Sequence, residues 1–214
     1  MTSPIRQSLR QSLLGMSTEE RAFRRQSIFL EILDTEVNYI NDLHLVIEYF
    51  LEPIRKKEML DKALIAKVFS NIEELLLTVN KPLLEKLKAL DSAEKVGWVF
   101  LEHVDLFKMY AVYCSNQPRL MQILEEAFAA SAELRKLDDR AKDDSKTRNQ
   151  GLRDFLILPM QRICRYPLLL ESMEKYTEGP TQVEIDVMKE VLYRYKALVT
   201  QINERTRKVE NVSK

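Results

Sequence analysis

Residues 155–176 read FLILPMQRICRYPLLLESMEKY, and this stretch decides the fold. Most of its side chains are apolar, which predicts a helix buried among other helices. Pro159 suits the first turn of that helix, where its missing N–H would have no partner in any case. Pro167 removes a backbone hydrogen bond to Ile163, so we expect the helix to bend there.

One line of this helix breaks the apolar pattern. It consists of Gln161, Arg165, Leu168 and Ser172. Their spacing of i, i+4, i+7 and i+11 places them within about 60° of one another on a helical wheel. The pattern predicts a long central helix that faces the core on one side and a partner on the other. The alternative is a kinked core helix whose Gln and Arg merely reach solvent.

The composition predicts an all-α protein. The chain has 214 residues, with 33 Lys and Arg balanced by 33 Asp and Glu. This length allows one large domain or two small ones, and the charge balance gives no basic excess for nucleic acid or an anionic membrane. Only four glycines occur, below the usual ~7%, so few hairpins or phosphate-binding loops can form. Good helix formers are abundant instead.

The two cysteines, Cys114 and Cys164, lie in apolar helical surroundings and do not suggest a disulfide framework. No apolar run approaches the ~18 residues of a membrane span, and the N-terminus lacks the apolar core of a signal peptide. We therefore expect a cytoplasmic protein with reduced thiols.

The first long helix is expected to begin at a capping box formed by Ser17 and Glu20. Residues 1–16 would then be a flexible tail or a short amphipathic arm. No Gly or Pro interrupts residues 18–52, and Pro53 is expected to end the helix.

Two faces of this first helix differ in character. An apolar arc is formed by Leu30, Leu33, Val37, Ile40 and Ile47. A separate polar stripe is formed by Glu31, Thr35, Asn38 and Asp42. A helix of this length must be supported by neighbours along one side, so the stripe is expected to face outward.

The rest of the chain predicts further helices over residues 58–90, with a break or bend at Pro82, and over 96–113, 119–136 and 181–208. Asn203 lies at the edge of the last helix's apolar face, where an amide needs a partner. The whole predicts an elongated bundle of about six long helices.

Residue patterns for covalent or metal chemistry are weak. His44 and His103 have no metal-ligand spacing, and the S-x-x-K of residues 92–95 lacks the motifs that accompany it in hydrolases. No Walker loop or G-x-G-x-x-G occurs. We expect no cofactor and no metal. Three polar lines, around Glu31, around Gln161 and Arg165, and around Asn203, predict a binding surface instead.

Three blocks of the sequence resemble the Dbl-homology domain, the module of guanine nucleotide exchange factors that acts on Rho-family GTPases. Residues 28–50, IFLEILDTEVNYINDLHLVIEYF, resemble the family's first block. Residues 96–117 resemble the second, and residues 156–176 resemble the third, whose pattern is roughly L-L-x-P-x-Q-R-x-x-K-Y-P-L-L-L. With the last helix, the resemblance covers residues 20–210. It assigns residues 17–210 to one helical domain.

The resemblance implies roles for the polar lines. Glu31 would bond the first switch of the GTPase, and Gln161, Arg165 and Asn203 would hold the second switch in a form that occludes the magnesium site. The GTPase-binding residues expected on this basis are Glu31, Thr35, Asn38, Ile157, Gln161, Arg165, Leu168, Ser172, Asn203 and Arg207.

Two of these positions bear on activity and specificity. The family usually has Lys where this chain has Arg165, and a planar guanidinium is not equivalent to a point donor. Ile157 occupies a position that contacts a residue differing between Rac-type and Cdc42-type GTPases. Isoleucine there resembles Rac-selective members.

The implied activity makes and breaks no covalent bond. Such a factor accelerates GDP release because it binds the nucleotide-free GTPase better than the GDP-bound form. The first alternative is a Dbl-like domain that binds a GTPase without exchange, because of Arg165. The second is a helical scaffold or membrane module, against which no helix concentrates Lys and Arg along one face.

The family's domain is usually followed by a pleckstrin-homology domain, which would recruit the protein to the plasma membrane. The 214 residues stop soon after the last predicted helix. Two readings stay open: that domain was removed, or the protein works without one.

Overall fold

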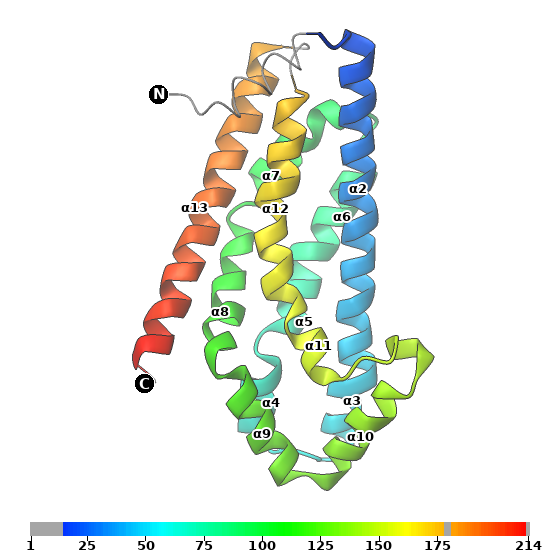
Figure 1. Ribbon diagram of the computed structural model, residues 1–214, viewed down its shortest axis with the longest axis vertical. Coiled ribbons are helices and arrows are strands. Elements are labelled where there is room, and N and C mark those ends of the chain that lie inside the picture. Colours follow the sequence, from blue (N-terminus) through cyan, green and yellow to red (C-terminus); the bar gives the residue numbers. More distant parts are fainter. Residues whose placement is uncertain (1–14, 178–180, 213–214) are drawn as a thin grey trace.

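The computed structural model describes residues 15–177 and 181–212, which form an elongated helical bundle without strands (Figure 1). The expected all-α bundle is confirmed. The tail expected over residues 1–16 lies mostly outside the described residues. The elements, in chain order, are α2 (Thr18–Leu45), the π-helical segment η1 (Val46–Leu51), α3 (Glu52–Lys56), α4 (Lys62–Phe69), α5 (Ile72–Glu74), the π-helical segment η2 (Leu75–Asn80), α6 (Lys81–Lys88), the 3-10 turn η3 (Ala93–Lys95), α7 (Val96–His103), the 3-10 turn η4 (Leu106–Met109), α8 (Tyr110–Ser115), the 3-10 turn η5 (Gln117–Arg119), α9 (Leu120–Ala130), α10 (Ala132–Lys142), the 3-10 turn η6 (Ser145–Thr147), α11 (Leu152–Leu156), α12 (Leu158–Lys175) and α13 (Gln182–Val212).

The first helix begins as its sequence predicts. The Ser17 hydroxyl accepts a hydrogen bond from the Glu20 backbone N–H at 3.1 Å, and the Ser17 N–H donates to the Glu20 carboxylate at 2.8 Å. This reciprocal capping box satisfies two N–H groups that the first turn leaves free.

Prolines do not end the helices where the sequence predicts. The helical path continues through Pro53 into α3, and through Pro82 into α6. In both places a π-helical segment comes directly before, and the N–H of Glu52 bonds the carbonyl of Ile47, five residues back. The wider turn accommodates a proline that would clash with a regular α-helix. The helical path ends instead after Lys56, next to Glu58 with a φ of 51°, and again at Ser70, whose φ is 49°.

The buried face of α2 also differs from the predicted arc. Leu30, expected in the core, is 50% exposed. Phe29, Ile32 and Leu43 are buried in its place. The predicted arc is therefore rotated, because the buried side of α2 also includes the carboxylate of Glu36, which hydrophobicity alone could not identify.

Aromatic rings fill the centre of the bundle beneath α12. Phe107 of η4 lies 4.8 Å from the Tyr166 ring and 5.0 Å from the Tyr195 ring, between centroids, and Phe100 of α7 lies 5.6 Å from Tyr195. These contacts are edge-on, the arrangement that aromatic pairs favour. They attach α12 and α13 to the helices behind them.

Helix α12 keeps Pro159 in its first turn, as predicted, and runs unbroken through the buried Pro167. It is separate from α11, which ends at Leu156, so residues 155–176 contain the end of one short helix and the whole of the next. Between them, the Leu156 carbonyl accepts hydrogen bonds from the Tyr113 hydroxyl at 2.7 Å and the Gln117 amide at 3.1 Å. These side chains replace the backbone partners that the end of α11 lacks.

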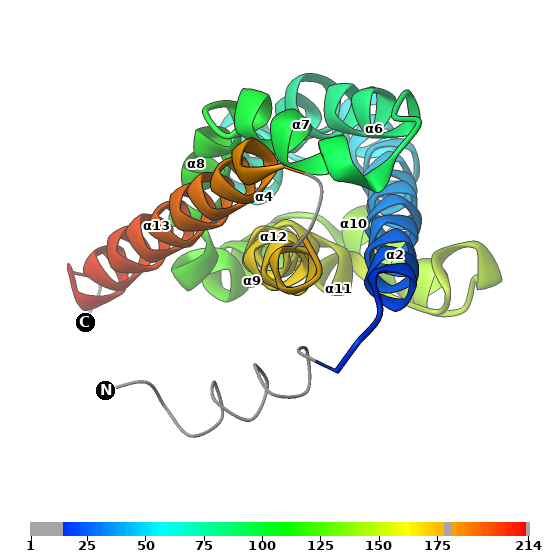
Figure 2. The same cartoon turned by 90° about the horizontal axis from the view of Figure 1, so that it is seen from above.

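Three helices form one side of the bundle. α12 lies between α2 and α13 and packs against both, while α6, α7 and α8 lie behind them and α9 and α10 lie at one end of the bundle (Figures 1 and 2). α2 and α12 run in opposite directions, as do α12 and α13. None of the helices described is long and apolar enough to span a bilayer.

Gly151 at the start of α11 permits a close contact that no other residue would allow. A Cβ there would meet the Asp138 carboxylate at 2.7 Å. Asp138 is buried and accepts a hydrogen bond from the Leu152 N–H at 2.6 Å, so it cannot move away. We expect Gly151→Ala to lower the free energy of unfolding by about 1–3 kcal/mol in urea titration.

Gly97→Ala is the matched control. A Cβ at Gly97 would meet the flexible end of Met188 and a methyl of Val187, both at 3.3 Å, so small side-chain movements suffice. A Gly151→Ala variant as stable as Gly97→Ala would contradict this account of the turn.

Candidate functional site

The outward sides of α2, α12 and α13 carry the residues that the sequence singled out. We call this surface the three-helix face and define it by Glu31, Gln161, Arg165 and Asn203, all of which are exposed. The Arg165 guanidinium lies 3.5 Å from the Glu31 carboxylate. The two side chains are 56% and 51% exposed, so the pair joins α2 to α12 at the surface and stays accessible.

Asn203 lies at the same level of the bundle as this pair. Lys196 of α13 pairs with Glu171 of α12 at 2.8 Å. Arg165 is six residues from Glu171, about 9 Å along its helix, and Asn203 is seven residues from Lys196, about 10 Å. Because α12 and α13 are antiparallel, both displacements point the same way. Asn203 of α13 therefore lies at about the level of the Glu31 and Arg165 pair along the bundle.

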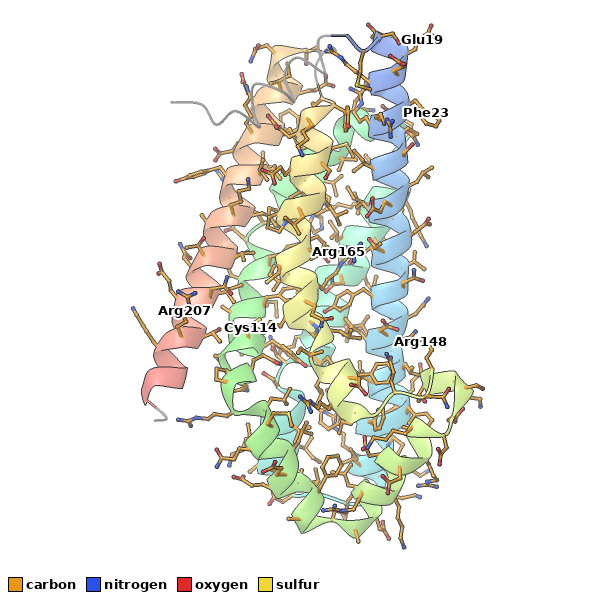
Figure 3. All side chains as sticks on the ribbon, in the orientation of Figure 1. Glu19, Phe23, Cys114, Arg148, Arg165 and Arg207 are labelled. Carbon is orange, nitrogen blue, oxygen red and sulfur yellow. The ribbon has the colours of Figure 1, made fainter. Side chains whose placement is uncertain are left out.

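A second row follows one turn away. Thr35 lies four residues after Glu31, Gln161 four residues before Arg165, and Arg207 four residues after Asn203. Each step moves about 6 Å in the same direction along the bundle. Figure 3 shows Arg165 on α12 at the side of α2, and Arg207 on α13 farther toward its C-terminal end. Thr35, Gln161 and Arg207 thus lie one helical turn from Glu31, Arg165 and Asn203, in the same direction along the bundle.

The predicted side chains differ in their freedom to bind, and Thr35 and Ser172 are half-buried. The hydroxyls of Thr35 and Ser172 donate to the carbonyls of Glu31 and Leu168 in their own helices, at 2.7 and 2.9 Å. The amides of Asn38, Gln161 and Asn203 make no side-chain hydrogen bond to the part of the chain described here.

Two apolar side chains complete the predicted set. Leu168 is 63% exposed and Ile157 is 41% exposed. Exposed apolar groups beside free amides and a charged pair are typical of a protein interface.

One member of the predicted α2 stripe does not belong to the face. Asp42 accepts from Arg148 at 2.6 Å, and its side chain is only 17% exposed. Arg148 has a φ of 56° and lies in the segment after α10. Asp42 therefore holds that segment against α2 and is not available to a partner.

The structure also shows a buried polar cluster that the sequence analysis missed. Glu36 is 0% exposed and Arg162 is 5% exposed. The Arg162 guanidinium donates to the Glu36 carboxylate at 2.5 Å, and the Tyr166 hydroxyl donates to the same oxygen at 2.8 Å. Glu36 and Arg162 do fall on the apolar sides of their helices, but that position alone does not show that a charged side chain is buried.

The cluster extends to the π-helical segment η2. The Asn80 amide donates to Glu36 at 2.8 Å and to the Tyr166 hydroxyl at 2.9 Å. The Tyr110 hydroxyl donates to the Asn80 carbonyl oxygen at 2.9 Å, and its oxygen lies 3.2 Å from the Tyr39 hydroxyl. We call Glu36, Arg162, Tyr166, Asn80 and Tyr110 the buried cluster. It connects α2, η2, α8 and α12.

The charges of the buried cluster are well defined. Burial raises the pKa of Tyr166 and of Tyr110 well above the usual tyrosine value, so both hydroxyls stay protonated and donate. Burial acts to lower the pKa of Arg162, but the Glu36 carboxylate and its hydrogen bond to the guanidinium outweigh it and raise the pKa. The guanidinium is therefore always charged.

No group of His, Cys, Asp and Glu side chains among the described residues is placed to hold a metal ion. The three-helix face is open, and its groups are amides, one ion pair and apolar side chains. Such groups can form a protein interface.

A family model matches most of the chain. It describes the RhoGEF domain and covers residues 28–203. The Myosin-M heavy chain of Dictyostelium discoideum is 37% identical over 204 residues, which cover 92% of this chain. Intersectin-1 of Homo sapiens is 29% identical over 206 residues, which cover 93%. The chain spans only 12% of the length of each of these two relatives.

Solved structures share the fold. A crystal structure of human RhoA in complex with the DH/PH fragment of PDZRHOGEF contains a chain that matches with a TM-score of 0.82 at 24% identity. The match covers 94% of this chain and 59% of that one. A structure on the PH and C1 domains of the Vav1 exchange factor matches with a TM-score of 0.77 at 27% identity, over 87% of this chain and 50% of that one.

Proposed function

Because this chain belongs to the RhoGEF domain family, we propose that it promotes GDP release from a Rho-family small GTPase by binding the nucleotide-free form through the three-helix face. The observation that carries the proposal is that Glu31, Arg165 and Asn203 are exposed at one level of three adjacent helices. These are the positions to which the family resemblance assigns the GTPase switches.

The proposed mechanism requires no covalent step. A thousandfold faster release needs about 4 kcal/mol of preferential binding to the nucleotide-free state. A few charge-assisted hydrogen bonds at about 1.5–3 kcal/mol each, with an apolar anchor, supply this amount in an interface of standard size. Glu31, Asn203 and Leu168 provide these two kinds of contact.

The ion pair between Glu31 and Arg165 is compatible with this role. Exposed pairs contribute about 0–1 kcal/mol, so a partner can replace one half of the pair at little cost. Until then, the pair holds both side chains at the centre of the face. Arg165 carries a positive charge at the position where the family usually has Lys.

Asn203 tests the α13 part of this face. Its amide is exposed and forms no side-chain hydrogen bond to the described residues, so Asn203→Ala removes nothing that the fold needs. We expect exchange to fall by at least about tenfold, because a buried interface hydrogen bond is lost, with no change in the thermal melt. Gln201, exposed two residues earlier on α13, provides the control Gln201→Ala.

The assay follows the release of a fluorescent GDP analogue from Rho-, Rac- and Cdc42-type GTPases. Acceleration with at least one of them is the expected result. Binding to a GTPase without acceleration would support the second candidate, a Dbl-like domain inactivated by Arg165, and Arg165→Lys should then restore exchange. Neither binding nor acceleration with any member of the panel would refute both.

We further propose a preference for Rac-type GTPases, supported by the exposure of Ile157 at the position that the family resemblance links to this choice. The gain or loss of one methyl or methylene contact in an apolar interface is worth about 1–3 kcal/mol. Ile157→Leu is therefore expected to lower the ratio of Rac-type to Cdc42-type exchange rates, while the melt stays the same. An unchanged ratio would show that Ile157 does not determine the choice between Rac-type and Cdc42-type GTPases.

The proposal includes a folded unit over residues 17–210 that acts in the cytoplasm and reaches the plasma membrane through an adjoining pleckstrin-homology domain. The family match over residues 28–203 supports the extent of this unit.

A further inference from the structure

The buried cluster lies directly behind the three-helix face. On α12, Arg162 follows the exposed Gln161, and Tyr166 follows the exposed Arg165. On α2, Glu36 lies five residues after Glu31. α2 and α12 therefore each carry a residue of the three-helix face on one side and, within two turns, a member of the buried cluster on the other.

The cluster joins the same two helices that the surface pair joins. Arg162 and Tyr166 of α12 both bond one oxygen of Glu36, at 2.5 and 2.8 Å, and Asn80 of η2 bonds the other oxygen at 2.8 Å. The carboxylate is thus held from two elements at once. The Arg162 guanidinium also lies 4.6 Å from the centre of the Tyr166 ring.

Apolar packing alone would fix this geometry less firmly. The neighbouring core residues of α2 and α12 are aliphatic or aromatic, and their attraction has no preferred direction. A shift of α2 by one residue rotates its side chains by about 100° and moves them about 1.5 Å. Such a shift would leave the Glu36 and Arg162 charges buried without partners, which is far more costly than a change of apolar contacts.

The cluster is not arranged for stability alone. The Nε of Arg162 is buried and has no hydrogen-bond partner among the residues that the structure describes. Burying two charges and one unsatisfied N–H is costly, and an apolar pair of similar volume is often at least as stable. What the charged pair adds is a single allowed arrangement of the helices.

We propose that Glu36 and Arg162 are positioning residues: they fix the rotation and sliding of α2 against α12, and so hold Glu31 and Arg165 in the arrangement that binds the nucleotide-free GTPase. This inference rests on the function proposed above. Neither residue touches the GTPase, because both are buried behind the face.

The test replaces both charges at once, in the double variant Glu36→Met with Arg162→Met. Removal of both partners leaves no unpaired buried charge, so we expect a folded protein whose melting temperature is unchanged or higher. Exchange should nevertheless fall between about tenfold and a hundredfold, because a displacement of about 1 Å at an interface is enough for such a loss.

A second variant keeps the proposal testable if the double variant fails to fold. Tyr166→Phe removes one hydroxyl from Glu36 and Asn80 and retains the ring that packs on Phe107. It should remain folded and lose less exchange than the double variant. The matched control is Arg25→Met with Glu94→Met, which removes a part-buried pair between α2 and η3 at 2.9 Å. The control should exchange at the wild-type rate.

A distance measurement reads the helix register without any GTPase. Nitroxide labels are placed on the exposed Cys164 of α12 and on Glu48→Cys of η1, while Cys114 is fully buried. Electron–electron resonance should give one narrow distance distribution for the parent protein and a broader one for the double variant. The width of the distance distribution and the exchange rate must change together.

Three results would overturn the inference. They are an unchanged distance distribution in the folded double variant, a broadened distribution with wild-type exchange, and an equal loss of exchange in the Arg25 and Glu94 control. If the parent protein accelerates GDP release from no GTPase, the proposed function has failed. The distance distributions then decide alone whether the charged pair fixes the register.

Discussion

Glu31→Ala is expected to slow catalysed GDP release by at least about a hundredfold, the largest functional effect of any single surface change in this protein. That factor corresponds to about 2.7 kcal/mol, the amount carried by one or two charge-assisted hydrogen bonds in the centre of an interface. Glu31 lies at the middle of α2's exposed side and is 51% exposed in the free protein.

Glu31→Ala should leave the stability of the fold unchanged. The only partner of the Glu31 carboxylate among the described residues is Arg165, at 3.5 Å, and an exposed pair contributes about 0–1 kcal/mol. The thermal melt of Glu31→Ala should therefore match the parent. The control is Glu48→Ala on the adjoining η1, where a 68% exposed carboxylate lies 3.7 Å from His44. Equal exchange rates in the two variants would rule out the α2 part of the face.

In contrast to Glu31→Ala, Glu36→Ala should lower the stability of the fold, and by more than any other single change considered. Removal of this carboxylate leaves the Arg162 charge buried with no opposite charge, and it also leaves Asn80 and Tyr166 with one lost partner each. Breaking one half of a buried pair costs about 3–5 kcal/mol.

Urea titration measures this loss as a shift of the midpoint at constant slope. Glu31→Ala serves as the control, since both variants delete a carboxylate from α2. A free energy of unfolding within about 1 kcal/mol of the parent would show that water or a rearranged side chain compensates Arg162, and the buried cluster would lose its importance.

The contrast between Glu31 and Glu36 shows what the sequence could predict. Exposed polar lines were visible because helical periodicity places Glu31 apart from the apolar arc, and Gln161 and Arg165 on one side of α12. The exposure of these residues agrees with that expectation. Which of them a partner contacts stays a prediction.

The buried charges could not be predicted in the same way. Periodicity treats a charged side chain as a surface residue, so it cannot identify Glu36 as buried until Arg162 and Asn80 are seen beside it. Leu30 was assigned to the core for the same reason, since the buried side of α2 was taken from its aliphatic residues alone.

Proline was the other source of error. Pro53 was expected to end the first helix, and Pro82 to break or bend the second. A local rule on proline assumes regular α-helical geometry, whereas the π-helical turns η1 and η2 provide the extra room just before each ring. Asn80 closes η2 and joins the buried cluster, so this irregular turn also positions a core side chain.

The central claim is that the three-helix face prefers an emptied GTPase, and the most direct measurement compares two affinities. The protein is titrated with one Rho-family GTPase in its nucleotide-free form and in its GDP-bound form. The account predicts at least about thousandfold tighter binding to the nucleotide-free form, equivalent to about 4 kcal/mol. Equal affinity for both forms would contradict it, because a protein that does not distinguish the two states cannot shift the balance between them.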